Sequence, residues 1–185
     1  SLTDQLFIKA KRIRSLETKQ VSMVGEGIRP EFIALINYGI VGLIQLDKGF
    51  ADHPDITPAE AMALYDQKAN EALELMTRKN HDYDEAWRDM RTTSYTDFIL
   101  TKLQRVKEIE DINGATLVSE GIDANYMDII NYAVFGAIKL AWHIEQDKDH
   151  SRQRLPDSAG TDLHILGIRE GQRPSGHAVQ DTRLP

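Results

Sequence analysis

The feature that most constrains this chain is an internal repeat, because a segment near its start returns in its second half. The patterns Ser-x-Thr-Asp, Glu-Gly-Ile and Ile-Asn-Tyr occur at residues 1–4, 26–28 and 36–38, and again at 94–97, 120–122 and 130–132. A repeated unit buries its apolar face by packing against its neighbouring copy. We therefore predict one pseudo-two-fold bundle that arose by internal duplication, and not two separate domains.

Apolar side chains recur at helical spacing in both copies. Ile99 and Leu103 are four residues apart, and residues 126–144 carry the broad apolar face that is typical of a core helix. Residues 57–60 read Thr-Pro-Ala-Glu, a capping box with proline at the first helical position, and predict a connecting helix over 57–78. No alternation of the β type is present, so the predicted fold class is all-α.

The sequence also suggests where several helices begin. Both copies open with Ser-x-x-Asp, which predicts N-caps at Ser1 and Ser94. Proline favours the first helical position, so Pro30 predicts Arg29 as the cap of the next helix. The equivalent cap in the second copy is Asp123.

We expect a single duplicated domain over residues 1–146, with copy one at 1–46 and copy two at 79–146. Residues 147–185 are rich in proline and glycine and predict an irregular tail, with a short strand at 163–168. Copy one lacks the segment that precedes Ser94 in copy two, so we expect a further helix upstream of Ser1. Without that helix, Leu6, Ile13 and Leu16 should be partly exposed, or covered by the tail or by another chain in a homo-oligomer.

Composition excludes several classes of function. The net charge of −7 over 185 residues argues against a nucleic-acid polymer as partner, because such binding depends on lysine and arginine. The absence of cysteine excludes disulfides, thiolate metal sites and a cysteine nucleophile. No apolar run approaches the roughly 20 residues that span a bilayer, and no signal peptide is visible, so we expect a soluble cytoplasmic protein without a membrane partner.

Three polar clusters are candidates for chemistry. The first joins Glu120 to Asp128 and Asn131, which lie three residues apart on one helical face, with Asn125 one turn earlier. Carboxylate and amide oxygens suit Mg²⁺. Spacing alone favours a structural role in which these groups link helices, but a carboxylate among apolar residues needs a partner if it is buried.

The second cluster pairs Lys102 with Arg105, with Glu108 next on the same face, and Lys9 and Arg12 repeat the pair in copy one. Two cations in line could bind phosphates, whereas a solvated face of charged pairs is the ordinary alternative.

The third cluster contains residues 81–83 (His-Asp-Tyr), Trp87, Arg88 and Arg91. It could stack a base and bind phosphate, or it could simply seal a corner between two helices.

With these residues the sequence resembles a known family, the first of the nucleotide modification associated domains. The resemblance covers about residues 1–143 and is carried by long motifs at 79–87, 94–97, 102–105 and 119–132. It extends distantly to the MazG-like all-α nucleoside triphosphate pyrophosphohydrolases, which hold Mg²⁺ with helix-borne acids.

The sequence departs from these patterns at three positions. Family members read Asp-Tyr-Gly where this chain has Asp84 after Tyr83. Copy one has Ala34 where copy two has Asp128, so only one full acidic site remains. The paired acids of MazG-like enzymes have only approximate counterparts at Glu108 and residues 110–111.

The resemblance implies a helical protein that binds a nucleotide, extending to Mg²⁺-dependent cleavage of a nucleoside triphosphate to release pyrophosphate. A non-catalytic nucleotide-binding module and a structural or interaction bundle are the alternatives. The expected catalytic residues are Glu120, Asp128 and Asp82, and the expected metal ligands are Glu108, Glu120 and Asp128. The residues expected to contact the nucleotide are Lys79, Tyr83, Trp87, Arg88, Lys102, Arg105 and Asn131.

Overall fold

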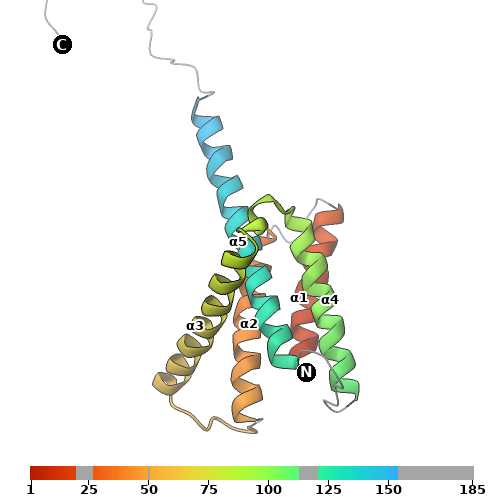
Figure 1. Ribbon diagram of the computed structural model, residues 1–185, viewed down its shortest axis with the longest axis vertical. Coiled ribbons are helices and arrows are strands. Elements are labelled where there is room, and N and C mark those ends of the chain that lie inside the picture. Colours follow the sequence, from red (N-terminus) through yellow and green to blue (C-terminus); the bar gives the residue numbers. More distant parts are fainter. Residues whose placement is uncertain (20–26, 50, 113–120, 154–185) are drawn as a thin grey trace, which may run out of the picture. The chain divides into compact units, whose positions relative to one another are not determined.

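The structure is a computed structural model that describes residues 1–19, 27–49, 51–112 and 121–153. These residues form five α-helices and one 3₁₀ helix, and they contain no strand, which confirms the predicted all-α class (Figure 1). The elements are α1 (Leu2–Lys19), α2 (Arg29–Lys48), α3 (Pro58–Asp82), η1 (Ala86–Asp89), α4 (Thr92–Asp111) and α5 (Ile122–Gln153). Residues Ser1–Lys148 form one compact unit. The strand expected at 163–168 lies outside the described residues.

Two of the predicted helix starts are confirmed by their hydrogen bonds. The Ser1 hydroxyl accepts a hydrogen bond from the Asp4 amide at 3.2 Å, one residue before α1 begins. Thr57 caps α3 with a reciprocal pair, in which the Glu60 amide donates to the Thr57 hydroxyl and the Thr57 amide donates to the Glu60 carboxylate. These hydrogen bonds satisfy backbone amides that have no partner within the first helical turn.

Other predicted starts were wrong by one to three residues. Ser94 lies inside the first turn of α4, because Thr92 and Thr93 already adopt helical geometry after the extended residue Arg91. Arg29 is the first residue of α2, and α5 likewise begins one residue before Asp123. A cap acts through one hydrogen bond, so neighbouring residues with helical backbone angles can displace it.

Two helices extend past their predicted ends. The connecting helix α3 does not stop at residue 78 but continues to Asp82, so residues 79–82 belong to α3 and not to a segment after it. Basic side chains in its last turn, at Lys79 and His81, favour the continuation because they face the negative end of the helix dipole. Helix α5 continues to Gln153, beyond the predicted boundary at 146, because residues 147–153 contain neither proline nor glycine.

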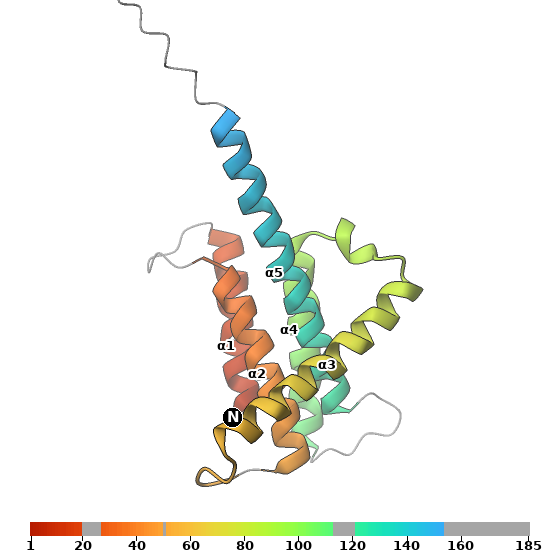
Figure 2. The same cartoon turned by 90° about the vertical axis from the view of Figure 1, so that its left-hand side faces the viewer.

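The helices α1, α2 and α4 pack side by side, and α3 runs obliquely from the end of α2 toward η1 (Figures 1 and 2). Leu6 and Ile13 are fully buried in the core, and Leu16 is partly buried. Our expectation that this face of α1 would be partly exposed was therefore wrong for Leu6 and Ile13. The reason is that α2 and α4 both pack on α1.

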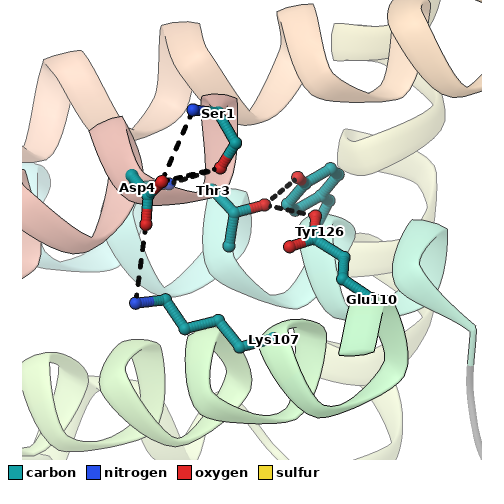
Figure 3. Close-up of polar contacts among 6 residues, drawn as sticks. All are labelled: Ser1, Thr3, Asp4, Lys107, Glu110 and Tyr126. Carbon is teal, nitrogen blue, oxygen red and sulfur yellow. Dashed lines mark hydrogen bonds and ion pairs between the residues drawn. The ribbon is translucent and has the colours of Figure 1, made fainter. Parts of the chain in front are cut away.

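Polar contacts between α1 and α4 occur in pairs with the roles exchanged. The Thr3 hydroxyl of α1 donates to the Glu110 carboxylate of α4 at 2.6 Å, and the Thr96 hydroxyl of α4 donates to the Glu17 carboxylate of α1 at 2.8 Å. Figure 3 shows the first of these pairs beside Tyr126. A threonine hydroxyl has one hydrogen, so the Tyr126 hydroxyl, 3.0 Å away, donates to Thr3.

A second pair of contacts follows the same exchange. Asp4 of α1 lies 3.7 Å from the Lys107 ammonium of α4 (Figure 3), and Asp97 of α4 binds the Arg14 guanidinium of α1. In the sequence repeat, Asp4 corresponds to Asp97 and Arg14 to Lys107. Each copy therefore presents the same face to the other.

The helices α2 and α5 meet through equivalent glycines. A Cβ atom on Gly42 would lie 2.7 Å from a ring carbon of Tyr126, and one on Gly136 would lie 2.8 Å from a ring carbon of Phe32. Gly42 corresponds to Gly136 in the repeat, and Phe32 to Tyr126. Such exchanged contacts are what a two-fold relation between the copies requires, and the superposition of the two copies stays a prediction.

Candidate functional site

A cavity of about 270 Å³ lies between the end of α3, η1, α4 and α5. Its walls combine aromatic and apolar side chains with a few polar groups. The lining residues are Met76, Lys79, Asn80, Tyr83, Ala86, Trp87, Met90, Phe98, Asp128, Asn131, Tyr132 and Phe135. An apolar cleft with few polar groups is the usual form of a site for a small molecule.

Asp128 lies at the charged end of this cavity, where it holds two lysines from different helices. Its side chain is 7% exposed, and its two carboxylate oxygens lie 2.5 Å from the Lys79 ammonium of α3 and 2.7 Å from the Lys102 ammonium of α4. We call these three residues the lysine clamp. The buried carboxylate has the partners that it needs, and the clamp carries one positive charge in excess.

Asn131 lies one turn after Asp128 on α5 and lines the same cavity. It is 5% exposed, yet neither its amide nitrogen nor its amide oxygen has a hydrogen-bond partner. The equivalent residue of copy one, Asn37, accepts a hydrogen bond of 2.6 Å from the Tyr65 hydroxyl. A buried amide without partners costs on the order of 1–3 kcal/mol, which a ligand with a matching polar edge would recover.

Trp87 forms an aromatic wall of the cavity. Its ring stacks on Phe135, with the centroids 4.6 Å apart and the planes 8° from parallel, and the Arg88 guanidinium lies 4.7 Å from the ring centroid. Its backbone oxygen accepts a hydrogen bond from the buried Tyr95 hydroxyl. The indole N–H is buried and has no hydrogen-bond partner.

The remaining aromatic residues differ in exposure. Tyr132 stacks on Phe98 at 5.1 Å, and burial, with the Asp128 charge nearby, raises the pKa of the Tyr132 phenol. Tyr132 therefore stays a neutral hydroxyl at physiological pH. Tyr83 is 71% exposed, so a flat ligand could bury its ring by stacking on it.

The wall formed by η1 is fixed to α5 by one lysine. The Lys139 ammonium donates to the backbone oxygens of Arg88, at 2.6 Å, and of Met90. Before η1 the chain reverses through Asp84 and Glu85, whose φ angles of 51° and 50° lie in the left-handed region. The resemblance described above predicts glycine at position 84, and glycine adopts this conformation without steric strain.

Several predicted site residues lie away from the cavity. Asp82 is exposed and pairs with His81 at 3.2 Å. Arg88 pairs with Glu85 at 2.7 Å, and its guanidinium does not line the cavity. These side chains belong to the surface of the α3–η1 junction.

The predicted pair of cations on α4 is divided between two partners. Lys102 binds Asp128, whereas Arg105 lies 3.2 Å from Glu108 on another part of the surface of α4. In copy one, the equivalents of these two cations, Lys9 and Arg12, both pair with the buried carboxylate of Glu31 on α2.

The described residues do not provide a magnesium site. Within the ranges 1–19, 27–49, 51–112 and 121–153 no three acidic or histidine side chains converge, and both oxygens of Asp128 are bound by lysines. Glu120, the expected partner of Asp128, lies outside these ranges.

Sequence reasoning missed the apolar half of the site, above all Phe98 and Phe135. A signal was present in the repeat, because copy one has Gln5 and Val41 at the equivalent positions. Copy one likewise has Ala34 at the position of Asp128. The cavity therefore lies where the sequence of copy two differs from that of copy one.

The chain belongs to the family described as Nucleotide modification associated domain 1, whose sequence model matches residues 1–46 and 79–140, more than half of the chain. Searches of curated proteins and of solved structures gave no significant match. The relation to MazG-like enzymes is not part of the family match and stays a prediction. Of the described helices, none is long and apolar enough to cross a membrane.

Proposed function

We propose that the cavity between α3, η1, α4 and α5 binds a nucleotide. The observation that carries the proposal is the unpartnered amide of Asn131, which is buried among aromatic rings and lies one turn from the lysine clamp. A nucleobase offers a donor and an acceptor side by side on one edge, which matches the two ends of a primary amide. The Asn131 amide thus provides hydrogen bonds to the base.

The other walls suit the other parts of a nucleotide. Tyr83 and the cavity-lining rings would stack against the base, since stacking on aromatic side chains is worth about 1–3 kcal/mol per base. The lysine clamp would bind phosphate, because the Lys79 ammonium has three donors and its ion pair with Asp128 uses one of them. Asp128 is on this view a positioning residue that holds both ammonium groups at the cavity wall.

Hydrolysis of a triphosphate is an alternative function, separate from the proposed binding of a nucleotide. It rests on the family resemblance and on Glu120 and Mg²⁺, and the described residues do not by themselves form the metal site. Release of pyrophosphate from a panel of nucleoside triphosphates with Mg²⁺ tests hydrolysis directly. Binding without turnover would favour a nucleotide-binding module.

The decisive experiment for binding uses the two equivalent asparagines. Trp87 lines the cavity and Trp142 does not, so a Trp142→Phe background leaves a single tryptophan that reports on the site. In this background Asn131→Leu and Asn37→Leu are compared by fluorescence titration with nucleotides of each base. We expect Asn131→Leu to weaken binding about tenfold or more, because the base would lose its polar partner. Asn37→Leu should bind like the parent.

Circular dichroism checks that both variants stay folded. Equal binding by Asn131→Leu and the parent would remove the amide from recognition. A parent protein that binds none of the nucleotides would refute the proposed function.

A further inference from the structure

We infer that the natural ligand of this cavity is a nucleoside monophosphate and not a triphosphate. The inference rests on the proposed function, since it specifies the phosphorylation state of the nucleotide. It follows from three properties of the described residues: the charge of the lysine clamp, the engagement of the neighbouring cations and the size of the cavity.

The lysine clamp can balance only a small negative charge. Lys79 and Lys102 supply two positive charges, and the Asp128 carboxylate between them cancels one. A phosphate monoester carries about −1.5 to −2 at neutral pH, which the clamp and the two remaining donors of the Lys79 ammonium can accommodate. A triphosphate brings two further anionic groups that would need cations of their own.

The neighbouring cations are already engaged elsewhere. Arg88 makes two hydrogen bonds with Glu85, at 2.7 and 3.0 Å. Arg105 pairs with Glu108, and the Lys139 ammonium donates to two backbone oxygens. Of the cations in the described ranges, only Lys79 lines the cavity, and Lys102 reaches its wall through Asp128.

The cavity volume sets a similar limit. At about 270 Å³, it falls just below the range of about 300–1,000 Å³ that is usual for ligand pockets. A base and a sugar fill such a space, so that a first phosphate reaches the lysine clamp and any further phosphates extend into solvent. The chain as a whole carries a net charge of −7, which disfavours an extended polyanion at its surface.

The test is a titration series on a single base, with the nucleoside, the monophosphate, the diphosphate and the triphosphate. Fluorescence of Trp87 is followed in the Trp142→Phe background, once with EDTA and once with Mg²⁺. We expect the monophosphate to bind at least about tenfold tighter than the nucleoside. The diphosphate and triphosphate should bind no more tightly than the monophosphate in either condition.

The repeat provides a matched pair of variants for the charge. Lys102→Met keeps the length of the side chain but leaves the clamp neutral, so the gain from nucleoside to monophosphate should fall from about tenfold to about twofold. Nucleoside binding by each variant serves as the reference for its own series. Lys9→Met removes the equivalent lysine of copy one, which pairs with Glu31, and should leave the whole series unchanged. If Lys102→Met does not fold, Lys79→Met tests the same charge from the more exposed side of the clamp.

The outcomes separate the two proposals. If no member of the series binds, the proposed function fails. If a triphosphate binds more than about tenfold tighter than the monophosphate, or if nucleoside and monophosphate bind equally, the function stands and the present inference is overturned.

Discussion

Asp84 and Glu85 are the described residues other than glycine with positive φ angles, and they lie directly before the wall of the cavity formed by η1. L-residues pay a steric penalty in this region, although aspartate tolerates it better than most. The expected glycine of the family pattern would remove that penalty at position 84. Aspartate at position 84 is therefore compatible with the turn, but it leaves the backbone strained at this residue.

Substituting Asp84→Gly should raise the free energy of unfolding by about 0.5–1 kcal/mol, because relief of the strained backbone exceeds the added entropy of the unfolded chain. The matched control is Asp82→Gly, two residues earlier in the last turn of α3, where glycine should lower stability by a similar amount. Urea denaturation of both variants measures the difference. A stability loss in Asp84→Gly would show that the turn is not strained at this residue.

At the scale of helices, periodicity predicted the elements well and their limits less well. The repeating apolar residues indicated the helices around Ile99 and over 126–144, because burial of one face depends on local spacing. The end of α3 was predicted too early, and the ion pair of Lys79 with Asp128, far along the chain, could not be seen from local spacing. The composition after residue 146 predicted an irregular tail, but α5 continues to Gln153.

The residues of the candidate site were likewise predicted only in part. Charged and aromatic residues in motifs were predicted as site residues. Five of them line one cavity: Lys79, Tyr83, Trp87, Asp128 and Asn131. Arg105 follows the ordinary alternative of a charged pair on a helix surface, because it pairs with Glu108 on its own helix. Phe98 and Phe135 carry no motif, so their role follows only from packing between helices.

The contact between α1 and α4 gives a prediction that depends on pH. Glu17 accepts a hydrogen bond from Thr96. Burial raises the pKa of its carboxyl above the usual 4.5, whereas the Thr96 hydrogen bond and the Arg14 charge lower it by a smaller amount. The folded state therefore holds this proton more tightly than the unfolded state. As pH rises from about 4.5 through the raised pKa, ionisation of Glu17 lowers the free energy of unfolding.

Glu17→Gln keeps the acceptor for Thr96 and removes the ionisation. Its stability relative to the native protein should therefore increase between pH 4 and pH 7, by about 1 kcal/mol or less. The control is Glu110→Gln, which alters the exchanged hydrogen bond with Thr3 at a residue that is exposed. Thermal denaturation over this pH range measures both. A difference for Glu17→Gln that stays constant with pH would contradict the assignment.

At the scale of the whole molecule, the two copies share one core. The rings of Phe32 and Tyr126 each pack against a glycine of the opposite copy, and hydrogen bonds link α1 to α4 in both directions. Residues of both copies also belong to one hydrophobic core. We therefore expect Ser1–Lys148 to unfold in a single cooperative transition.

Phe32→Ala tests this cooperativity from the copy that lacks the cavity. Phe32 is fully buried against Gly136, so its removal should lower the free energy of unfolding by about 3–5 kcal/mol. If the core is shared, the midpoint measured by Trp87 fluorescence, in a Trp142→Phe background, should fall together with the midpoint measured by circular dichroism. The neighbouring substitution Ile33→Ala, at a partly exposed position, should change both midpoints little. If the helical signal of one copy is lost while the Trp87 signal keeps its original midpoint, the copies fold independently. The cavity would then depend on copy two alone, and the exchanged contacts would stabilise an interface between two folding units.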